Sequence, residues 1–328
     1  MSKIRMKKVF IDGSAGTTGL RIRERLASRE DIQLISLPEE LRKDTEARRK
    51  ALNGADVAFL CLPDAAAIEA VQLVENPETV IIDTSTAHRT ADGWEYGFPE
   101  LEGRRERIAA TKRIANPGCH ASGFIALVET LVRKRLITVN ERLTAFSLTG
   151  YSGGGKKMIA DYETAGTNLH IGGRQYALGQ KHKHLPEMAK ICGLVNEPSF
   201  SPIVVPHLSG MEVTVPLFAS QFRESGTTLE QVKDAYRSYY GDGEESGERA
   251  SRPFGLVRFV DDPAAAEGGF LSSAALSGRD DMEISVYGND ERMVLVSRFD
   301  NLGKGASGAA IQNMNIVLGV AENAGLVV

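Results

Sequence analysis

Short apolar runs alternate with polar stretches of helical spacing over the first hundred residues. The apolar runs predict strands at residues 8–12, 32–36, 57–62 and 79–83. The polar stretches predict helices at residues 20–28, 42–52 and 65–74. Right-handed crossovers arrange such β/α units as an open, doubly wound parallel sheet. The pattern therefore predicts a Rossmann-type domain of α/β class whose ligands bind at the carboxyl ends of the strands.

The pattern changes near Gly118, where the β/α alternation gives way to strands and long loops. Alternating apolar and polar positions predict a mixed, largely antiparallel sheet with strands at 143–148, 213–219, 283–287 and 293–298. A terminal helix rich in small residues begins near Asp300, and we expect it to pack on the first domain. Two domains follow: residues 1–117 with 301–328 bind a nucleotide, and residues 118–300 form an α+β catalytic and oligomerisation domain.

Composition narrows the class of protein. The chain has 328 residues, a net charge of -4 and a pI near 6.0, and these values argue against a nucleic-acid or anionic-membrane surface. The three cysteines are widely spaced and odd in number, so neither a disulfide framework nor a zinc site is expected. The basic amino terminus has no signal-peptide or membrane-span pattern. We expect a cytoplasmic protein that acts on a small molecule, without a metal. The acidic stretch 241–253 predicts an exposed loop with no chemistry that we can assign.

A glycine-rich turn follows the first predicted strand. Gly13, Gly16 and Gly19 permit close approach of a pyrophosphate at the start of a helix, although tight packing alone also explains such glycines. The second strand ends at Ser36, without the acidic residue that holds a ribose 2′-hydroxyl, and Arg42 follows. NADP(H) is therefore preferred over NAD, while Arg42 can also be an ordinary surface charge. The predicted contacts are Gly13, Ser14, Ala15, Gly16, Thr17, Thr18, Gly19, Ser36 and Arg42.

Cys119 is the predicted nucleophile. It ends the tetrapeptide Asn116-Pro117-Gly118-Cys119 and precedes the apolar helical run from Ala121 to Leu131. The unpaired N–H groups and positive dipole end of a helix favour thiolate over thiol. A hydrolase, a redox sensor or a buried structural cysteine would also fit this position taken alone.

Three further segments supply candidate partners for the thiol. Ser85 and Arg89 follow the fourth strand and suit a phosphate or carboxylate, or else form a capped surface turn. Gly153 lies in the glycine-rich segment 149–157, which predicts a flexible turn or a backbone wall of the thiol's pocket. His182 and His184 are two apart; a third ligand with supporting spacing is not evident, so a general base is favoured over zinc.

Taken together, the blocks GSAGTTG, DTSTAHR, NPGC, GYSGGGK, HKHLPE and DNLGKGASGAAIQNM resemble the N-acetyl-gamma-glutamyl-phosphate reductases, specifically their shorter second type. The blocks extend from residue 7 to residue 319. The resemblance implies an NADP-dependent, cytoplasmic enzyme of arginine biosynthesis that forms a homodimer or homotetramer, related in fold to aspartate-semialdehyde and glyceraldehyde-phosphate dehydrogenases. It matches Cys119 to the family's nucleophile and the His182 and His184 pair to its acid/base region. His120 departs from the family, where a tyrosine commonly follows the cysteine.

The resemblance and the chemistry together predict a mechanism. Cys119 attacks the acyl phosphate of N-acetyl-L-glutamyl 5-phosphate, phosphate leaves towards Ser85 and Arg89, and a thioester forms. Hydride from NADPH then gives an oxyanion, which His182 or His184 protonates as N-acetyl-L-glutamate 5-semialdehyde is released. Asn301 is expected to contact the nicotinamide amide, and Asn116 and Gly153 the substrate.

Other functions stay open at this stage. A reductase for a related acyl phosphate, such as aspartyl phosphate or a carrier-linked aminoadipyl phosphate, would use the same residues. A cysteine hydrolase would need no cofactor, and the glycine turn argues against it. A non-catalytic NADP-sensing protein would keep the turn and need no thiolate.

Overall fold

The computed structural model describes residues 6–164, 170–241 and 255–328. It divides into two compact units, one formed by the residues up to Gly118 with Ala306–Val327 and the other by Cys119–Gly305. The boundaries expected from the sequence lay after residues 117 and 300, so the segment 301–305 falls with the second unit instead of the first. Of the predicted loop 241–253, all but Gly241 lies outside the described residues.

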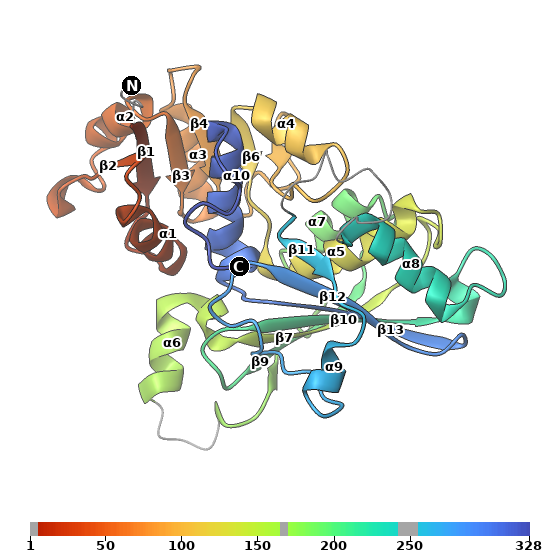
Figure 1. Ribbon diagram of the computed structural model, residues 1–328. Coiled ribbons are helices and arrows are strands. Elements are labelled where there is room, and N and C mark those ends of the chain that lie inside the picture. Colours follow the sequence, from red (N-terminus) through yellow and green to blue (C-terminus); the bar gives the residue numbers. More distant parts are fainter. Residues whose placement is uncertain (1–5, 165–169, 242–254) are drawn as a thin grey trace. The chain divides into compact units, whose positions relative to one another are not determined.

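The first unit contains a six-stranded parallel sheet with the strand order β2-β1-β3-β4-β6-β5 (Figure 1). The chain crosses over after β1 and β3 in opposite directions along this order, as the doubly wound prediction requires. The elements are β1 (Lys7–Asp12), α1 (Thr17–Ala27), β2 (Ile32–Ile35), α2 (Thr45–Asn53), β3 (Val57–Leu60), α3 (Asp64–Gln72), β4 (Val80–Asp83), β5 (Glu95–Tyr96), α4 (Arg104–Ala110), β6 (Arg113–Ala115) and α10 (Gly308–Leu318).

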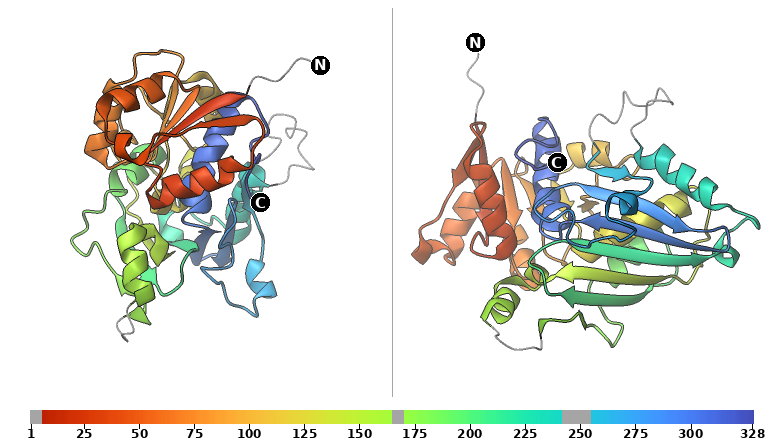
Figure 2. Two further views of the ribbon diagram at one scale, coloured as in Figure 1. Left: turned by 90° about the vertical axis from the view of Figure 1, so that its left-hand side faces the viewer. Right: turned by 60° about the horizontal axis from the view of Figure 1, so that its bottom comes forward.

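Helices cover both faces of this sheet (Figure 2). Alternate residues of a strand point to opposite faces, and Val57 and Phe59 of β3 pack with α1, α4 and α10, whereas Ala58 and Leu60 pack with α2 and α3. Because both faces are covered, β3 and β4 are buried throughout and appear in the sequence as continuous apolar runs. Helix α10, about two hundred residues away in the sequence, completes one of these layers.

The second unit contains a seven-stranded mixed sheet with the order β11-β12-β13-β10-β7-β9-β8. Four of its six pairings are antiparallel, which confirms the largely antiparallel prediction. The elements are α5 (Cys119–Arg133), β7 (Thr144–Gly150), α6 (Gly155–Thr164), β8 (Arg174–Gln175), α7 (Leu185–Cys192), β9 (Ser199–Val205), β10 (Met211–Phe218), α8 (Leu229–Tyr240), β11 (Val257–Phe259), α9 (Pro263–Ala266), β12 (Met282–Gly288) and β13 (Arg292–Phe299).

Two sequence predictions of local structure are wrong. The glycine-rich segment 149–157 is not a loop: it forms the end of β7, a 3-10 turn at Tyr151–Gly154 and the start of α6. The terminal helix does not begin at Asp300, because a π turn at Gly303–Ser307 precedes α10. In both places glycines occur in short non-α helical turns, which local composition does not distinguish from flexible connectors.

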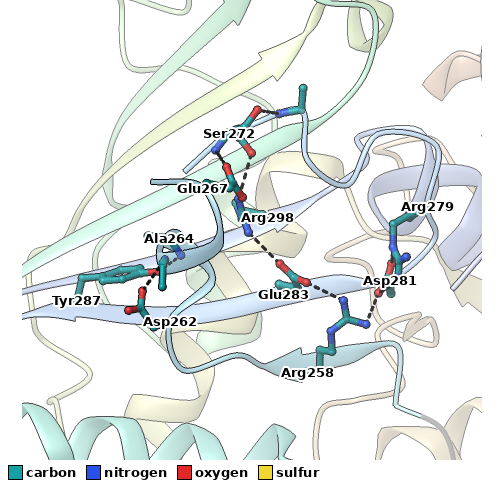
Figure 3. A network of polar contacts seen from close by, with 12 residues as sticks. Arg258, Asp262, Ala264, Glu267, Ser272, Arg279, Asp281, Glu283, Tyr287 and Arg298 are labelled. Carbon is teal, nitrogen blue, oxygen red and sulfur yellow. Dashed lines mark hydrogen bonds and ion pairs between the residues drawn. The ribbon is translucent and has the colours of Figure 1, made fainter. Parts of the chain in front are cut away.

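Helices α5, α7 and α8 lie over one face of the seven-stranded sheet (Figure 1). On the opposite face Phe146 and Phe218 expose 45% and 60% of their surface. A row of alternating charges also crosses β11, β12 and β13 on this face (Figure 3): Arg258 bonds Glu283 at 2.6 Å, and Glu283 bonds Arg298 at 3.1 Å. Arg298, in the middle of these ion pairs, is only 4% exposed. One part of this face therefore carries buried charged side chains, and another part carries exposed apolar ones.

Candidate active site

A pocket of about 740 Å³ in the first unit lies at the carboxyl ends of β1 and β2. It brings together five of the predicted cofactor residues, namely Gly13, Ser14, Ala15, Ser36 and Arg42. Its cationic lining also includes Arg23 and Lys43, which the sequence analysis missed because helix and loop cations are ordinarily surface charges. In the sequence, the only indication of this larger cationic lining is Lys43, which directly follows Arg42.

The glycine turn brings backbone segments of the first unit into close contact, with no room for side chains. Gly13 has φ +85°, and a Cβ there would lie 2.2 Å from the carbonyl oxygen of Cys61. Gly19 packs on the same turn, since its Cβ would lie 2.6 Å from the Gly13 oxygen. Helix α1 begins at Thr17 and has no side-chain cap and no acidic residue in its first turn. Its first N–H groups are therefore suited to a pyrophosphate, and the cations near Ser36 suit a further phosphate.

A buried ion pair lies at the wall of this pocket. The Arg48 guanidinium donates to Asp12 Oδ2 from Nε at 3.0 Å and from Nη2 at 2.9 Å, and both side chains are almost fully buried. Burial raises the pKa of Asp12, opposed by the hydrogen bonds and charge of Arg48. The pair joins α2 to the end of β1, so it holds the second strand-helix unit against the glycine turn.

The loop after β4 gathers its polar side chains around Asp83. The fully buried Asp83 accepts hydrogen bonds from the Ser85 hydroxyl at 2.7 Å and contacts His88 Nδ1 at 2.6 Å. The His88 ring stacks on Trp94 with 4.0 Å between centroids. The Ser85 hydroxyl is therefore oriented by a carboxylate, an arrangement that the sequence did not reveal.

Arg89 and Asn116 organise the segment that leads to Cys119. Arg89 donates from Nε to the Asn116 carbonyl at 3.0 Å and from Nη2 to the Thr84 carbonyl at 3.1 Å. The Asn116 side chain donates to the Ala306 carbonyl at 3.0 Å and accepts from Asn313 at 3.2 Å. These contacts connect the loop after β4 with α10 and with the residue two positions before it. Contacts of Arg89 and Asn116 with a phosphate or substrate stay a prediction.

Cys119 is the first residue of the 15-residue helix α5, as expected. It is partly exposed, and Gly305 lies against it: a Cβ on Gly305 would lie 3.0 Å from the Cys119 Cβ and 3.2 Å from the Phe299 ring. Any larger residue at 305 would crowd the Cys119 side chain. Cys61 and Cys192 differ, because burial raises the pKa of both thiols, that of Cys61 to about 12.

Three histidines form a cluster immediately beside the helix start. The ring centroids of His182 and His184 are 4.7 Å apart, and those of His120 and His182 are 5.4 Å apart. The Phe200 ring packs on both His120 and His182 at about the same distance. The structure thus brings the predicted histidine pair to the residue that follows Cys119.

The two members of the pair have different surroundings. His184 is 4% exposed, precedes α7 and lies 3.8 Å from the buried Glu187 carboxylate. His182 is partly exposed, and its Nδ1 accepts the backbone N–H of His184 at 3.2 Å. A nitrogen that accepts a hydrogen bond carries no proton, so neutral His182 holds its proton on Nε2.

Gly153 and Asn301 lie together in the second unit. A Cβ on Gly153 would lie 3.4 Å from Asn301 Nδ2, which donates to the Ser152 hydroxyl at 2.9 Å. Asn301 Oδ1 accepts the Gly210 N–H at 3.0 Å. This buried amide thus joins the 3-10 turn that contains Gly153 to the segment before β10. A nicotinamide contact by Asn301 stays a prediction.

Within the described residues, no three histidine, cysteine or acidic side chains are arranged to bind a metal ion. Over the same residues, every helix falls short of the length or apolarity needed to cross a membrane. The arrangement of a partly exposed thiol at a helix start with neighbouring imidazoles suits covalent acyl transfer with proton transfer.

Comparison with known families defines the class. Residues 119–301 match the semialdehyde dehydrogenase dimerisation domain, and residues 36–111 match the semialdehyde dehydrogenase NAD binding domain. Aspartate semialdehyde dehydrogenase II of Vibrio cholerae, solved in complex with ASA, has a similar fold (TM-score 0.70, 16% identity, 96% of this chain and 98% of that one). The enzyme of Candida albicans, solved with NADP, has TM-score 0.64 and 17% identity over 97% of this chain and 99% of that one. The fold is that of the semialdehyde dehydrogenases.

Closer relatives identify the family. N-acetyl-gamma-glutamyl-phosphate reductase 2 of Nostoc sp. is 43% identical over 97% of this chain and 99% of its own length. The reductase of Brucella ovis is 43% identical, with 95% and 99% covered, and that of Burkholderia lata is 40% identical, with 96% and 97% covered. The chain belongs to the N-acetyl-gamma-glutamyl-phosphate reductase family.

Proposed function

We propose that the chain reduces N-acetyl-L-glutamyl 5-phosphate to N-acetyl-L-glutamate 5-semialdehyde and phosphate, with NADPH, as a cytoplasmic step of arginine biosynthesis. The observation that carries the proposal is Cys119 at the start of α5 beside the His120, His182 and His184 cluster. Relatives that share 40–43% of their residues with this chain carry the name of that reductase.

NADP(H) is the proposed cofactor. The uncapped start of α1 suits its pyrophosphate, and Ser36 with Arg42 and Lys43 suits a 2′-phosphate. When bound, the cofactor supplies a hydride to the acyl carbon. The lining also includes Glu39 and Glu40, and Arg42 lies 4.0 Å from Glu39. These carboxylates partly neutralise the positive charge of the pocket when no phosphate is bound.

Cys119 is the proposed nucleophile. Its thiolate attacks the acyl carbon, the C–O bond to phosphate breaks, and a thioester forms. Backbone N–H groups of the first turn of α5 stabilise the oxyanion of each tetrahedral species, an effect worth about 3 kcal/mol for each donor. Because Gly305 lacks a side chain, the thiol has room on the side where the chain leaves β13.

His182 is the proposed acid. Its Nδ1 is occupied by the His184 backbone, so the proton available for transfer is on Nε2. This proton passes to the oxyanion and gives the neutral thiohemiacetal; when the C–S bond then breaks, the hydroxyl proton returns to Nε2 and Cys119 leaves as the thiolate. In the oxidative direction Nε2 accepts the same hydroxyl proton. His184 is buried against Glu187 and would support the ring of His182 rather than exchange protons with the substrate.

The remaining predicted residues have supporting roles in this proposal. Ser85, oriented by Asp83, and Arg89 would receive the leaving phosphate. Asn116, in the segment before Cys119, and Gly153, in the 3-10 turn after β7, would bind the substrate. Asn301 would approach the nicotinamide.

The test is phosphate-dependent reduction of NADP with a panel of semialdehydes. We expect strong preference for N-acetylglutamate semialdehyde over the aspartate compound, and preference for aspartate semialdehyde would overturn the substrate assignment. Cys119→Ser should form no acyl-enzyme in a burst experiment. Normal turnover by that variant would exclude the thioester route, whereas wild-type protein that binds NADPH without turnover would support a non-catalytic sensor.

We further propose that the second unit forms a homodimer through the sheet face opposite α5. That unit matches a dimerisation domain, and this face exposes Phe146 and Phe218. Light scattering after size exclusion should show a dimer, or a tetramer built from dimers. Phe218→Arg should shift the population towards monomer, and an unchanged mass would place the interface elsewhere.

A further inference from the structure

His120 occupies the position next to the nucleophile, and the mechanism above does not use it. Its ring is 3% exposed and lies under the start of α5. Its Nδ1 is 2.7 Å from the Ser147 hydroxyl, and its Nε2 is 2.7 Å from the Tyr176 hydroxyl. Each ring nitrogen therefore has a hydroxyl partner, one on β7 and one immediately after β8.

The sheet explains why these two hydroxyls face the same ring. Ser147 of β7 pairs with Pro202 of β9, and the Tyr176 N–H donates to the Pro202 carbonyl at 3.1 Å. Ser147, Pro202 and Tyr176 thus form a row across three strands, under the N-terminal turn of α5. Since His120 follows Cys119 in this turn, the row lies against the residue next to the thiol.

The hydrogen-bonded chain is neutral at ordinary pH. Burial, with the charges of His182 and Lys183, lowers the pKa of His120 to about 3. Burial raises the pKa of Tyr176, and a negative charge on Cys119 raises it further. The groups facing His120 are Ser147, Tyr176, His182, His184 and Phe200, of which none carries a fixed negative charge. A neutral imidazole with both nitrogens engaged holds its partners in place and is a poor proton carrier.

We propose that Tyr176 is a substrate-binding residue of the thiol site and that His120, braced by Ser147, is the positioning residue that aims its hydroxyl at the acyl group on Cys119. A tyrosine hydroxyl has one donor and two acceptor sites, so binding to His120 leaves capacity for a second hydrogen bond. Its partner would be an uncharged polar group of the substrate, such as an amide or the acyl oxygen. This inference rests on the proposed function for the identity of the substrate.

The chain offers matched variants for a test. Tyr176→Phe removes only the hydroxyl, and His120→Phe removes both hydrogen bonds while keeping a ring against Phe200 and His182. Each variant should raise KM for N-acetylglutamate semialdehyde about five- to tenfold, the usual effect of one lost hydrogen bond. KM for NADP should stay unchanged. Tyr162→Phe, which alters a tyrosine stacked on Tyr151, is the control.

The double variant separates positioning from general loss of structure. If His120 acts through Tyr176, the double variant should be no worse than either single variant, because the hydroxyl contributes only when oriented. The acid and base limbs of the kcat profile should keep their wild-type positions in all three proteins, with unchanged thermal midpoints in Tyr176→Phe.

Four results would overturn the inference: an unchanged KM in Tyr176→Phe, additive effects in the double variant, a displaced limb of the kcat profile in His120→Phe, or an altered KM for NADP. A displaced limb would make His120 a third proton-transfer group. If wild-type protein does not oxidise N-acetylglutamate semialdehyde at all, the proposed function fails instead, and the same KM comparison is made on the semialdehyde that it does oxidise.

Discussion

A Cβ on Gly305 would lie 3.0 Å from the Cβ of Cys119. The same atom would lie 3.1 Å from the Asp300 carbonyl oxygen and 3.2 Å from the Phe299 ring, so the position is closed on three sides. Gly305 belongs to the π turn before α10, whereas Cys119 begins α5. The terminal segment of the second unit therefore limits where the Cys119 side chain can lie.

Gly305→Ala should lower kcat about ten- to hundredfold, because a displacement of the thiol by a fraction of an ångström spoils the attack geometry. NADPH binding by the first unit, measured by nucleotide fluorescence, should not change. Gly172→Ala is the control, since nothing lies within 4 Å of its added Cβ. Wild-type kcat in Gly305→Ala would show that the thiol tolerates displacement.

Cofactor preference should depend on the end of β2. Ser36→Asp places a carboxylate where a 2′-phosphate is proposed, so KM for NADPH should rise at least about tenfold and KM for NADH should fall. Arg42→Ala should raise KM for NADPH alone. Lys50→Ala, on α2 but outside the pocket lining, is the control. Equal effects on both nucleotides would place the 2′-phosphate elsewhere.

His120 should make the fold sensitive to acid. Its folded pKa of about 3 lies below the ordinary value of 6.5, so the unfolded state binds the additional proton between these values. The contribution of neutral His120 to the free energy of unfolding is therefore fully present above about pH 6.5. Between that pH and the folded pKa it falls by roughly 1.4 kcal/mol per pH unit. His120→Phe should therefore lose less stability than wild type between pH 6.5 and pH 4.5.

Tyr176→Phe provides the control for this comparison. It removes one of the two hydrogen bonds of His120 and keeps the imidazole, so its acid dependence should follow that of wild type. Urea unfolding at the two pH values measures the difference, and parallel behaviour of His120→Phe and wild type would contradict the prediction.

The Asp12 and Arg48 pair should be required for the stability of the nucleotide-binding unit. Arg48→Met leaves the buried Asp12 without its cation and should lower the free energy of unfolding by about 3–5 kcal/mol. The chain's single tryptophan, Trp94, lies in this unit and reports its unfolding by fluorescence.

Two variants calibrate that result. Asp12→Asn combined with Arg48→Met should recover a large part of the loss, because no uncompensated charge is left. Arg49→Met, which breaks exposed ion pairs with Glu46 and Glu75, should change the free energy by less than about 1 kcal/mol. Equal destabilisation by Arg48→Met and Arg49→Met would show that burial of the pair contributes nothing.

The sequence alone determined the alternating units from β1 to β4, four strands of the mixed sheet (β7, β10, β12 and β13), the glycine turn after β1 and the thiol at the start of α5. These features are local, because period, turn residues and helix starts are properties of neighbouring residues in the chain. Where local composition was ambiguous, as in the glycine-rich segments 149–157 and 300–307, the predictions were wrong.

Only the tertiary structure decided which side chains meet. The contacts of Asp83 with Ser85 and His88, and of His182 with the His184 backbone, are local in sequence and depend on turn geometry that residue spacing alone does not show. Arg48 reaches Asp12 across 36 residues, and His120 joins Ser147 and Tyr176, which lie 27 and 56 residues away. Such contacts depend on strand order and helix packing, and the amino-acid pattern of any one segment carries no information about the segment that packs against it.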